Sequence, residues 1–168
     1  AIVLHRAQKV EQALVEIDKA LAAEPRNPGF RSLKAAILSR LGEQELSIEL
    51  YGQVLAEFPN QPKVWMSYGH ALKTGGRRRE SIEAYRKSIE LAPNLGESYW
   101  SLANLKTYRF TPGEVEAMHA QLARTDLNDT DRFHFEFALG KALEDERKFE
   151  ESFTHYLKGN ALRRTGIP

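Results

Sequence analysis

Apolar side chains recur at helical spacing near the start of the chain. Val10, Leu14, Ile17 and Leu21 lie three or four residues apart, which places them on one face of a helix. The pattern predicts an amphipathic helix over residues 8–22. Its apolar stripe needs a neighbouring surface to cover it.

Residues of the same kind return every thirty-four positions. Three series keep this interval, namely a proline, a large apolar or aromatic residue and a small residue: Pro25, Pro59, Pro93; Ile17, Tyr51, Tyr85; and Ala13, Ser47, Ser81. A period of this length is typical of stacked helix-turn-helix units rather than of one domain around a central core. It favours a binding function over catalysis.

The repeat continues past Pro93 with an insertion. Five residues recur seventy-one positions later, which is two periods plus three residues: Gly69 and Gly140, Ala71 and Ala142, Leu72 and Leu143, Ser81 and Ser152, and Tyr85 and Tyr156. The unit between them therefore carries three extra residues.

This register predicts a partial unit over 1–27 and full units over 28–61, 62–95, 96–132 and 133–166. Helices are expected near 28–41, 44–57, 62–75, 78–92, 131–145 and 148–162. In the unit with the insertion, Thr111-Pro112-Gly113-Glu114 predicts a helix start, with a capping residue, proline at the first helical position and glutamate at the third. The helix over 8–22 is then the second of its pair, and only residues 1–7 are left for the first.

Small residues occupy one position of each first helix and one of each second helix: Ala35, Gly69, Ala103, Gly140; and Ala13, Ser47, Ser81, Ser152. Where they face each other, two helices can approach to the ~8–10 Å of packed pairs. We therefore expect Gly69→Leu to destabilise the fold by overpacking.

Composition excludes several functions. The chain of 168 residues has no cysteine and a formal net charge of +1, so disulfides, thiolate catalysis and cysteine zinc sites are excluded, and no strong basic excess suggests nucleic-acid binding. No apolar run approaches the ~20 residues of a membrane helix, and Ala1 to Leu4 are too short for a secretory signal. The run Arg77-Arg78-Arg79 is interpreted as a solvated turn, with a phosphate or acidic contact as the alternative.

No catalytic or cofactor motif is found. Both phosphate-binding glycine loops are absent, and the five histidines show no metal-ligand spacing. Two acidic clusters, 144–146 and 150–151, lie at a predicted helix end and a predicted helix start, and the macrodipole accounts for the second. We expect no enzyme activity, cofactor or metal in this chain.

Trp65, Tyr68-Gly69, Leu72, Ser81, Tyr85, Ser88 and Pro93 resemble the tetratricopeptide repeat pattern. The resemblance implies an all-α fold, a right-handed α-solenoid of about four full repeats after a partial one, over 1–168. It also implies a concave groove, lined by the first helices, that binds a protein or peptide. Inward positions carried over from the family include Arg40, Lys63, Met66, His70, Lys73, Trp100, Asn104, Tyr108, His134, Phe137 and Lys141.

Two aromatic residues of this row have two interpretations. Trp100 and Phe137 are either groove anchors or inter-repeat core, since aromatics are common in both. Repeats that grip a chaperone carboxylate place asparagine at the ninth position. Here Ala36 and His70 occupy it and only Asn104 fits, which argues against that specialisation.

A narrower resemblance rests on residues 99–107, on 137–145 and on Gly159-Asn160-Ala161-Leu162-Arg163-Arg164. These segments are similar to bacterial proteins in which tetratricopeptide repeats precede a sulfotransferase domain. The family's catalytic domain binds 3′-phosphoadenosine-5′-phosphosulfate through a Pro-Arg-Ser-Gly-type loop, and no such loop occurs up to Ile167-Pro168. The resemblance implies a non-catalytic N-terminal region.

Three hypotheses follow. The chain is a scaffold that binds a protein or peptide in its groove, or it is the repeat region that presents a substrate to a sulfotransferase domain. A homo-oligomer through exposed solenoid ends is the third, because uncovered apolar faces self-associate. Nucleic acid and membrane are not expected partners, and the composition suits the bacterial cytoplasm.

Overall fold

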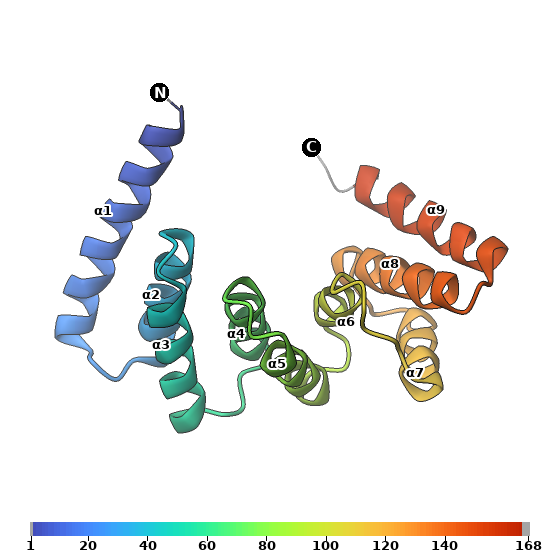
Figure 1. The fold of residues 1–168 in the computed structure, drawn as a ribbon, viewed down its shortest axis with the longest axis horizontal. Helices are drawn as coiled ribbons and strands as arrows, with labels where there is room; N and C mark the ends of the chain where they lie inside the picture. Colours follow the sequence, from blue (N-terminus) through green and yellow to red (C-terminus); the bar gives the residue numbers. More distant parts are fainter. Residues whose placement is uncertain (1, 166–168) are drawn as a thin grey trace. The chain divides into compact units, whose positions relative to one another are not determined.

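The computed structural model describes residues 2–165, with side chains from 9 to 164, and these residues contain nine helices and no strand (Figure 1). The predicted all-α class is confirmed. The chain divides into two compact units, Ala1–Lys87 and Ser88–Pro168, and each is described by itself. Ile167 and Pro168 lie outside the described residues.

The first unit contains helices α1 (Ile2–Ala23), α2 (Pro28–Arg40), α3 (Gln44–Glu57), α4 (Pro62–Thr74) and most of α5 (Arg78–Leu91). Proline occupies the start of α2 and of α4, where its missing N–H is unneeded and its φ suits the helix. The helices from α2 to α5 agree with the predicted ranges to within one residue.

The prediction for residues 1–7 was wrong where they are described. They were expected to belong to a separate first helix, but residues 2–7 continue α1 without a break, giving a helix of 22 residues. No turn signal of glycine or proline separates residue 7 from residue 8, so nothing ends the helix there.

The core of the first unit lies between α2, α3, α4 and α5. Ile48 and Tyr51 of α3 are 3% exposed and pack with Ala71 and Leu72 of α4. At its edge, the buried Arg31 of α2 forms a 2.8 Å ion pair with Glu57 of α3. Hydrogen bonds from Arg31 and then Arg26 hold the pKa of Glu57 below its usual value.

Small residues lie where α2 packs on α3 and α4 on α5, whereas Ala13 of α1, from the same predicted series, is exposed. Ala35 and Ser47 are fully buried, and Ser47 Oγ donates a 2.7 Å hydrogen bond to the Ala35 carbonyl. At Gly69, an added Cβ would lie 2.6 Å from the ring of Tyr85, a distance that no packed side chain tolerates. The predicted reason for small residues is therefore present in this unit.

The second unit contains α6 (Gly96–Ala103), α7 (Pro112–Leu122), α8 (Asp129–Asp145) and α9 (Phe149–Thr165). The insertion falls after α6, which has 8 residues where α4 has 13. Lys106, with φ of +63°, lies in the connection that follows. The chain resumes a helix at Thr111, whose side chain forms the predicted capping box with Glu114.

Helix α8 is the centre of this unit, because α6, α7 and α9 all pack on it (Figure 1). Its fully buried Phe135 and Leu139 form a core with Tyr99 of α6 and Met118 of α7. Helix α6 starts at Gly96, where a side chain has no room, because an added Cβ would lie 2.3 Å from the Asp131 carbonyl oxygen. The Gly96 N–H donates to the Asp131 carboxylate at 2.9 Å.

Candidate partner-binding surface

An aromatic cavity of about 440 Å³ opens on the second unit. Its walls come from α6, α8 and α9, and the residues that line it are Trp100; Phe133, His134 and Phe137; and Tyr156, Asn160 and Arg163. Its volume lies within the ~300–1,000 Å³ range of ligand sites, which are likewise mostly apolar with a few polar groups. We name it the aromatic cavity.

Trp100 and Phe137 are neighbours in its lining. Their ring centroids lie 5.5 Å apart, and Phe133 packs edge-on against Phe137 at 6.0 Å. Trp100 also packs against the core of the unit. Both residues are half-buried and line the cavity. For Trp100, the two alternatives from the sequence therefore describe two sides of the same ring.

Two glycines let α9 approach α8 beside the cavity. An added Cβ at Gly140 would lie 2.8 Å from the Tyr156 ring, and one at Gly159 would lie 3.0 Å from Phe137. Tyr156 is held in place as its hydroxyl donates to the Glu144 carboxylate at 2.9 Å. Burial raises the pKa of Tyr156, and the Glu144 carboxylate adds to this, so the phenol stays protonated and can donate.

Polar groups occur at the cavity's edge. Asn160 and Arg163 are exposed and form no side-chain hydrogen bond or ion pair within residues 9–164. His134 Nδ1 is buried without a hydrogen bond of good geometry, although the Thr130 backbone lies near the ring. Burial lowers the pKa of His134 in spite of nearby Glu97. A ligand would therefore meet an amide, a guanidinium and a neutral imidazole.

The other predicted groove residues of this unit differ in availability. Asn104 is exposed at the end of α6. Tyr108 is buried, and its hydroxyl donates to Glu114 at 2.6 Å. Lys141 forms an ion pair with Asp145, which also binds Arg109. Burial opposes ionisation of Asp145, but hydrogen bonds from Arg109 and Lys141 outweigh it and lower its pKa.

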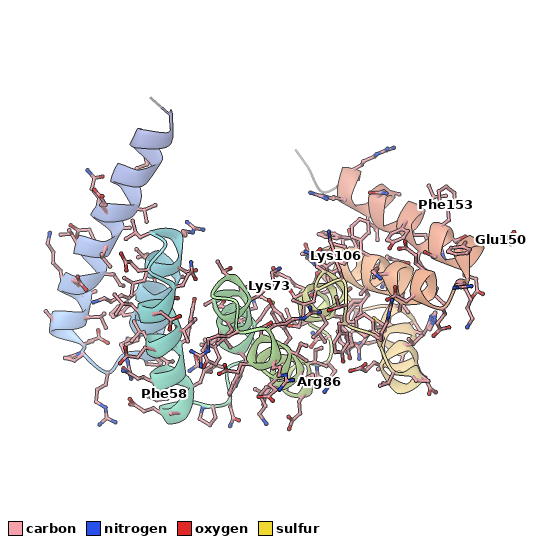
Figure 2. The ribbon with its side chains drawn as sticks, in the orientation of Figure 1. Phe58, Lys73, Arg86, Lys106, Glu150 and Phe153 are labelled. Atoms are coloured by element: carbon pink, nitrogen blue, oxygen red, sulfur yellow. The ribbon has the colours of Figure 1, made fainter. Side chains whose placement is uncertain are left out.

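In the first unit, Arg40, Lys63 and Lys73 are exposed (Lys73 is labelled in Figure 2). His70 is half-buried, and its Nδ1 lies 2.8 Å from the Tyr85 hydroxyl. Met66 is 9% exposed and belongs to the buried side of α4. The basic residues are thus accessible to a partner, whereas Met66, like Tyr108, is covered by its own unit.

Four cavity residues were absent from the predicted row, namely Phe133, Tyr156, Asn160 and Arg163. The row was taken only from inward positions of first helices, and three of these residues are on the second helix α9. Phe133 is at the first position of its unit, outside the family's inward positions. The pair Gly140 and Gly159 was the available signal, because two glycines facing two aromatic rings bring α9 close to α8.

The described residues also bear on two other kinds of feature, a metal cluster and a membrane span. No cluster of three or more histidine or acidic side chains there could hold a metal ion, and none of the described helices combines the length and apolarity of a membrane span. Arg77 forms an ion pair with Glu80, with N···O distances of 2.8 and 2.6 Å, at the turn before α5. This ion pair gives Arg77, one of the three arginines of the run, a structural role that needs no phosphate or acidic partner.

Antiparallel helix pairs repeated along the chain, with small residues at their crossings, define a helical-repeat protein. Residues 62–95 match the sequence model of the tetratricopeptide repeat. The chain therefore contains this repeat, and the resemblance noted from the sequence is supported for that family.

A curated relative is the small glutamine-rich tetratricopeptide repeat-containing protein 2 of Mycosarcoma maydis. It is 33% identical over 82 residues, which are 49% of this chain and 23% of the relative. The chain thus spans about a quarter of that protein's length.

Solved structures share the fold at low identity. A crystal structure of MamA has a TM-score of 0.67 and 16% identity, covering 96% of this chain and 92% of that one. PilF of Pseudomonas aeruginosa has a TM-score of 0.68 and 21% identity, with 94% and 70% covered. The C-terminal part of a TPR repeat-containing protein from Cytophaga hutchinsonii has a TM-score of 0.65 and 15% identity, with 95% and 62% covered.

Proposed function

We propose that this chain is a non-catalytic scaffold that binds a protein or peptide partner, and that the aromatic cavity holds one anchoring side chain of that partner. The single observation that supports this most is the cavity itself, which Trp100 and Phe137 line together with the exposed Asn160 and Arg163. Aromatic pockets with a few unsatisfied polar groups are where partner hot spots insert.

Asn104, at the end of α6, and Lys141, on α8, extend the proposed contact on the helices that carry the cavity. Arg40, Lys63, His70 and Lys73 of the first unit are proposed as further partner contacts on that unit. Basic residues at such positions suit an acidic or carboxylate-bearing partner segment. A bacterial cytoplasmic location is part of the same proposal.

The test uses a peptide library selected against the chain, followed by fluorescence titration of the selected peptide. Trp65→Phe leaves Trp100 as the sole tryptophan, because the chain has two, so its emission reports cavity occupancy. Trp100→Ala and Arg163→Ala, each followed with a labelled peptide, are expected to weaken binding by about 1–3 kcal/mol. Lys158→Ala, an exposed cation of α9 outside the cavity, serves as the matched control. Equal affinity of all variants would refute the cavity.

A second candidate is the repeat region of a sulfotransferase that presents the acceptor. It is supported by the motif over 137–145 and 159–164. Gly140 and Gly159 of that motif pack on Tyr156 and Phe137, so packing already accounts for these two glycines. Loss of acceptor sulfation in the full protein upon deletion of the repeats would favour this candidate, and retained activity would oppose it.

A further inference from the structure

Side chains from three helices of the second unit meet on one flank of α8. His119 comes from α7, Glu136 from α8 and His155 from α9, and the two outer helices both pack on α8 (Figure 1). Glu136 is 7% exposed, His155 is half-buried and His119 is exposed. None of the three lines the aromatic cavity, so the proposed partner contacts do not account for them.

Glu136 orients the ring of His155. The Glu136 carboxylate lies 2.5 Å from Nδ1 of His155. Because an ionised carboxylate can only accept a hydrogen bond, this ring nitrogen is the donor. The opposite nitrogen, Nε2, is then the one that can bind a ligand. Histidines that coordinate a metal ion usually donate their other ring N–H to a carboxylate, a carbonyl or water, which fixes the ring and strengthens it as a ligand.

A second imidazole lies beside this oriented ring. The ring centroids of His119 and His155 are 5.7 Å apart, and the rings are inclined at 63°. Two imidazoles that share one tetrahedral ion have their centres about 5 Å apart, because each metal–nitrogen bond is about 2.0–2.1 Å long. The exposed His119 forms no hydrogen bond or ion pair within residues 9–164. Its ring is therefore free to turn a nitrogen toward an ion held by His155.

An ion pair alone would explain part of this cluster. A protonated His155 would neutralise the buried Glu136 carboxylate, but the position of His119 would have no role. No three histidine or acidic side chains of the described residues are placed to hold an ion together. Two imidazoles and water therefore make up the coordination shell that the geometry allows. The spacing in the sequence could not reveal this pair, because its members come from different helices.

We propose that His119 and His155 form a two-histidine site for a divalent transition-metal ion, with Glu136 as the residue that positions His155. Imidazole suits Zn²⁺, Ni²⁺ and Cu²⁺, and nitrogen sites bind Cu²⁺ most tightly of the three. Mg²⁺, which requires oxygen ligands, should not bind. A bound ion would join α7 directly to α9. The site is independent of the aromatic cavity and of any partner bound there.

Titration of the metal-free chain with ZnCl₂ tests the site, followed by calorimetry and by NMR of the imidazole nitrogens. The wild type is expected to form a complex with one ion per chain. Among the nitrogens of His155, the signal of Nε2 should move most, because Nδ1 is held by Glu136. CuCl₂ should bind more tightly than ZnCl₂, and MgCl₂ should leave the signals of both rings unchanged.

Three variants separate the roles of the residues. Glu136→Gln should weaken zinc binding by about tenfold, the lower end of the effect of a group that orients a metal ligand. His119→Gln and His155→Gln should each weaken it further, since one imidazole is left. His5→Gln replaces a histidine of the first unit and is the control, with binding equal to that of the wild type.

Circular dichroism verifies that each variant folds. If a variant of the Glu136–His155 contact unfolds, His119→Gln decides the test, because His119 is exposed and its replacement leaves that contact in place. Absence of zinc binding up to about 1 mM, a weak affinity for any specific site, overturns the proposal. So does binding that His119→Gln leaves unchanged. A folded Glu136→Gln with wild-type affinity would refute the positioning role of the carboxylate.

Discussion

The hydroxyl of Ser152 donates a 2.7 Å hydrogen bond to the carbonyl of Gly140 on the facing helix. Ser47 and Ala35 form the same bond at the same distance in the other unit. In both pairs the donor follows the acceptor by twelve residues. Each pair therefore combines a small side chain, which lets the helices approach, with a buried hydrogen bond that joins them.

We predict that Ser152→Ala lowers the free energy of unfolding by about 1 kcal/mol, the usual net value of one buried hydrogen bond. Urea denaturation followed by circular dichroism measures this. Ser81 is a matched control because it occupies the same repeat position and is fully buried, but its Oγ has no hydrogen-bond partner. Ser81→Ala should be neutral or slightly stabilising. An equal loss in both variants would contradict the assigned role of the hydrogen bond.

Two equivalent glycines should respond differently to the same substitution. An added Cβ would lie 2.6 Å from Tyr85 at Gly69 and 2.8 Å from Tyr156 at Gly140. Both hydroxyls are hydrogen-bonded, Tyr85 to His70 and Tyr156 to Glu144. The ring of Tyr85 is fully buried and has no room to shift, whereas that of Tyr156 borders the open aromatic cavity. Gly69→Ala should therefore cost about 1–3 kcal/mol, and Gly140→Ala clearly less. Gly69→Leu should be more severe than either.

Thermal unfolding compares these variants, with Gly113→Ala as the control. Gly113 is in α7, where an added Cβ meets no atom within 4 Å. This substitution should stabilise the protein by up to about 1 kcal/mol, because alanine favours the helix. Equal melting temperatures for Gly69→Ala and Gly140→Ala would show that the cavity does not provide room for the Tyr156 ring.

The start of α7 allows a further test. The Glu114 N–H donates to Thr111 Oγ1 at 3.2 Å, and the Thr111 N–H donates to the Glu114 carboxylate at 2.8 Å. Thr111→Ala should lower the free energy of unfolding by about 1 kcal/mol, as loss of a capping residue does. Thr111→Ser should keep most of that stability, because serine also caps a helix. Chemical denaturation of the two variants distinguishes the cap from the bulk of the side chain. A cost that serine does not reduce would point to the methyl group instead.

Helix positions could be predicted from the sequence because they depend on local signals. The prolines at 28, 62 and 112 and the thirty-four-residue period each fix an element to within a few residues. Helix α1 differs because its boundary was inferred from the family's two-helix unit, while residues 2–7 carry no turn signal. From the sequence, the three extra residues could be assigned only to the unit 96–132. An insertion does not by itself show which helix of the unit is shortened, so the short α6 was not predicted.

The aromatic cavity was predictable only in part. Trp100 and Phe137 occupy inward positions, so the repeat register identifies them. Asn160 and Arg163 come from α9 and reach the cavity because Gly159 lets this helix approach Phe137. That approach depends on packing between residues far apart in sequence. A row of positions along the first helices cannot include it.

The half-buried ring of His134, whose Nδ1 is buried without a hydrogen bond, should make stability fall on acidification. Burial lowers its pKa below the ordinary 6.5 in the folded chain, so the unfolded chain binds a proton more readily in the window beneath that value. Stability then decreases as the pH falls through about 6.5, and His134→Gln should lose this part of the pH dependence.

Urea denaturation between about pH 7.5 and 5.5 should therefore show the wild type losing its advantage in free energy of unfolding over His134→Gln. His119→Gln, which alters an exposed histidine of α7, is the control and should follow the wild type. The wild type's advantage in free energy of unfolding over His134→Gln could instead be the same at every pH, or grow on acidification. Either result would refute the claim that the His134 imidazole is neutral in the folded chain.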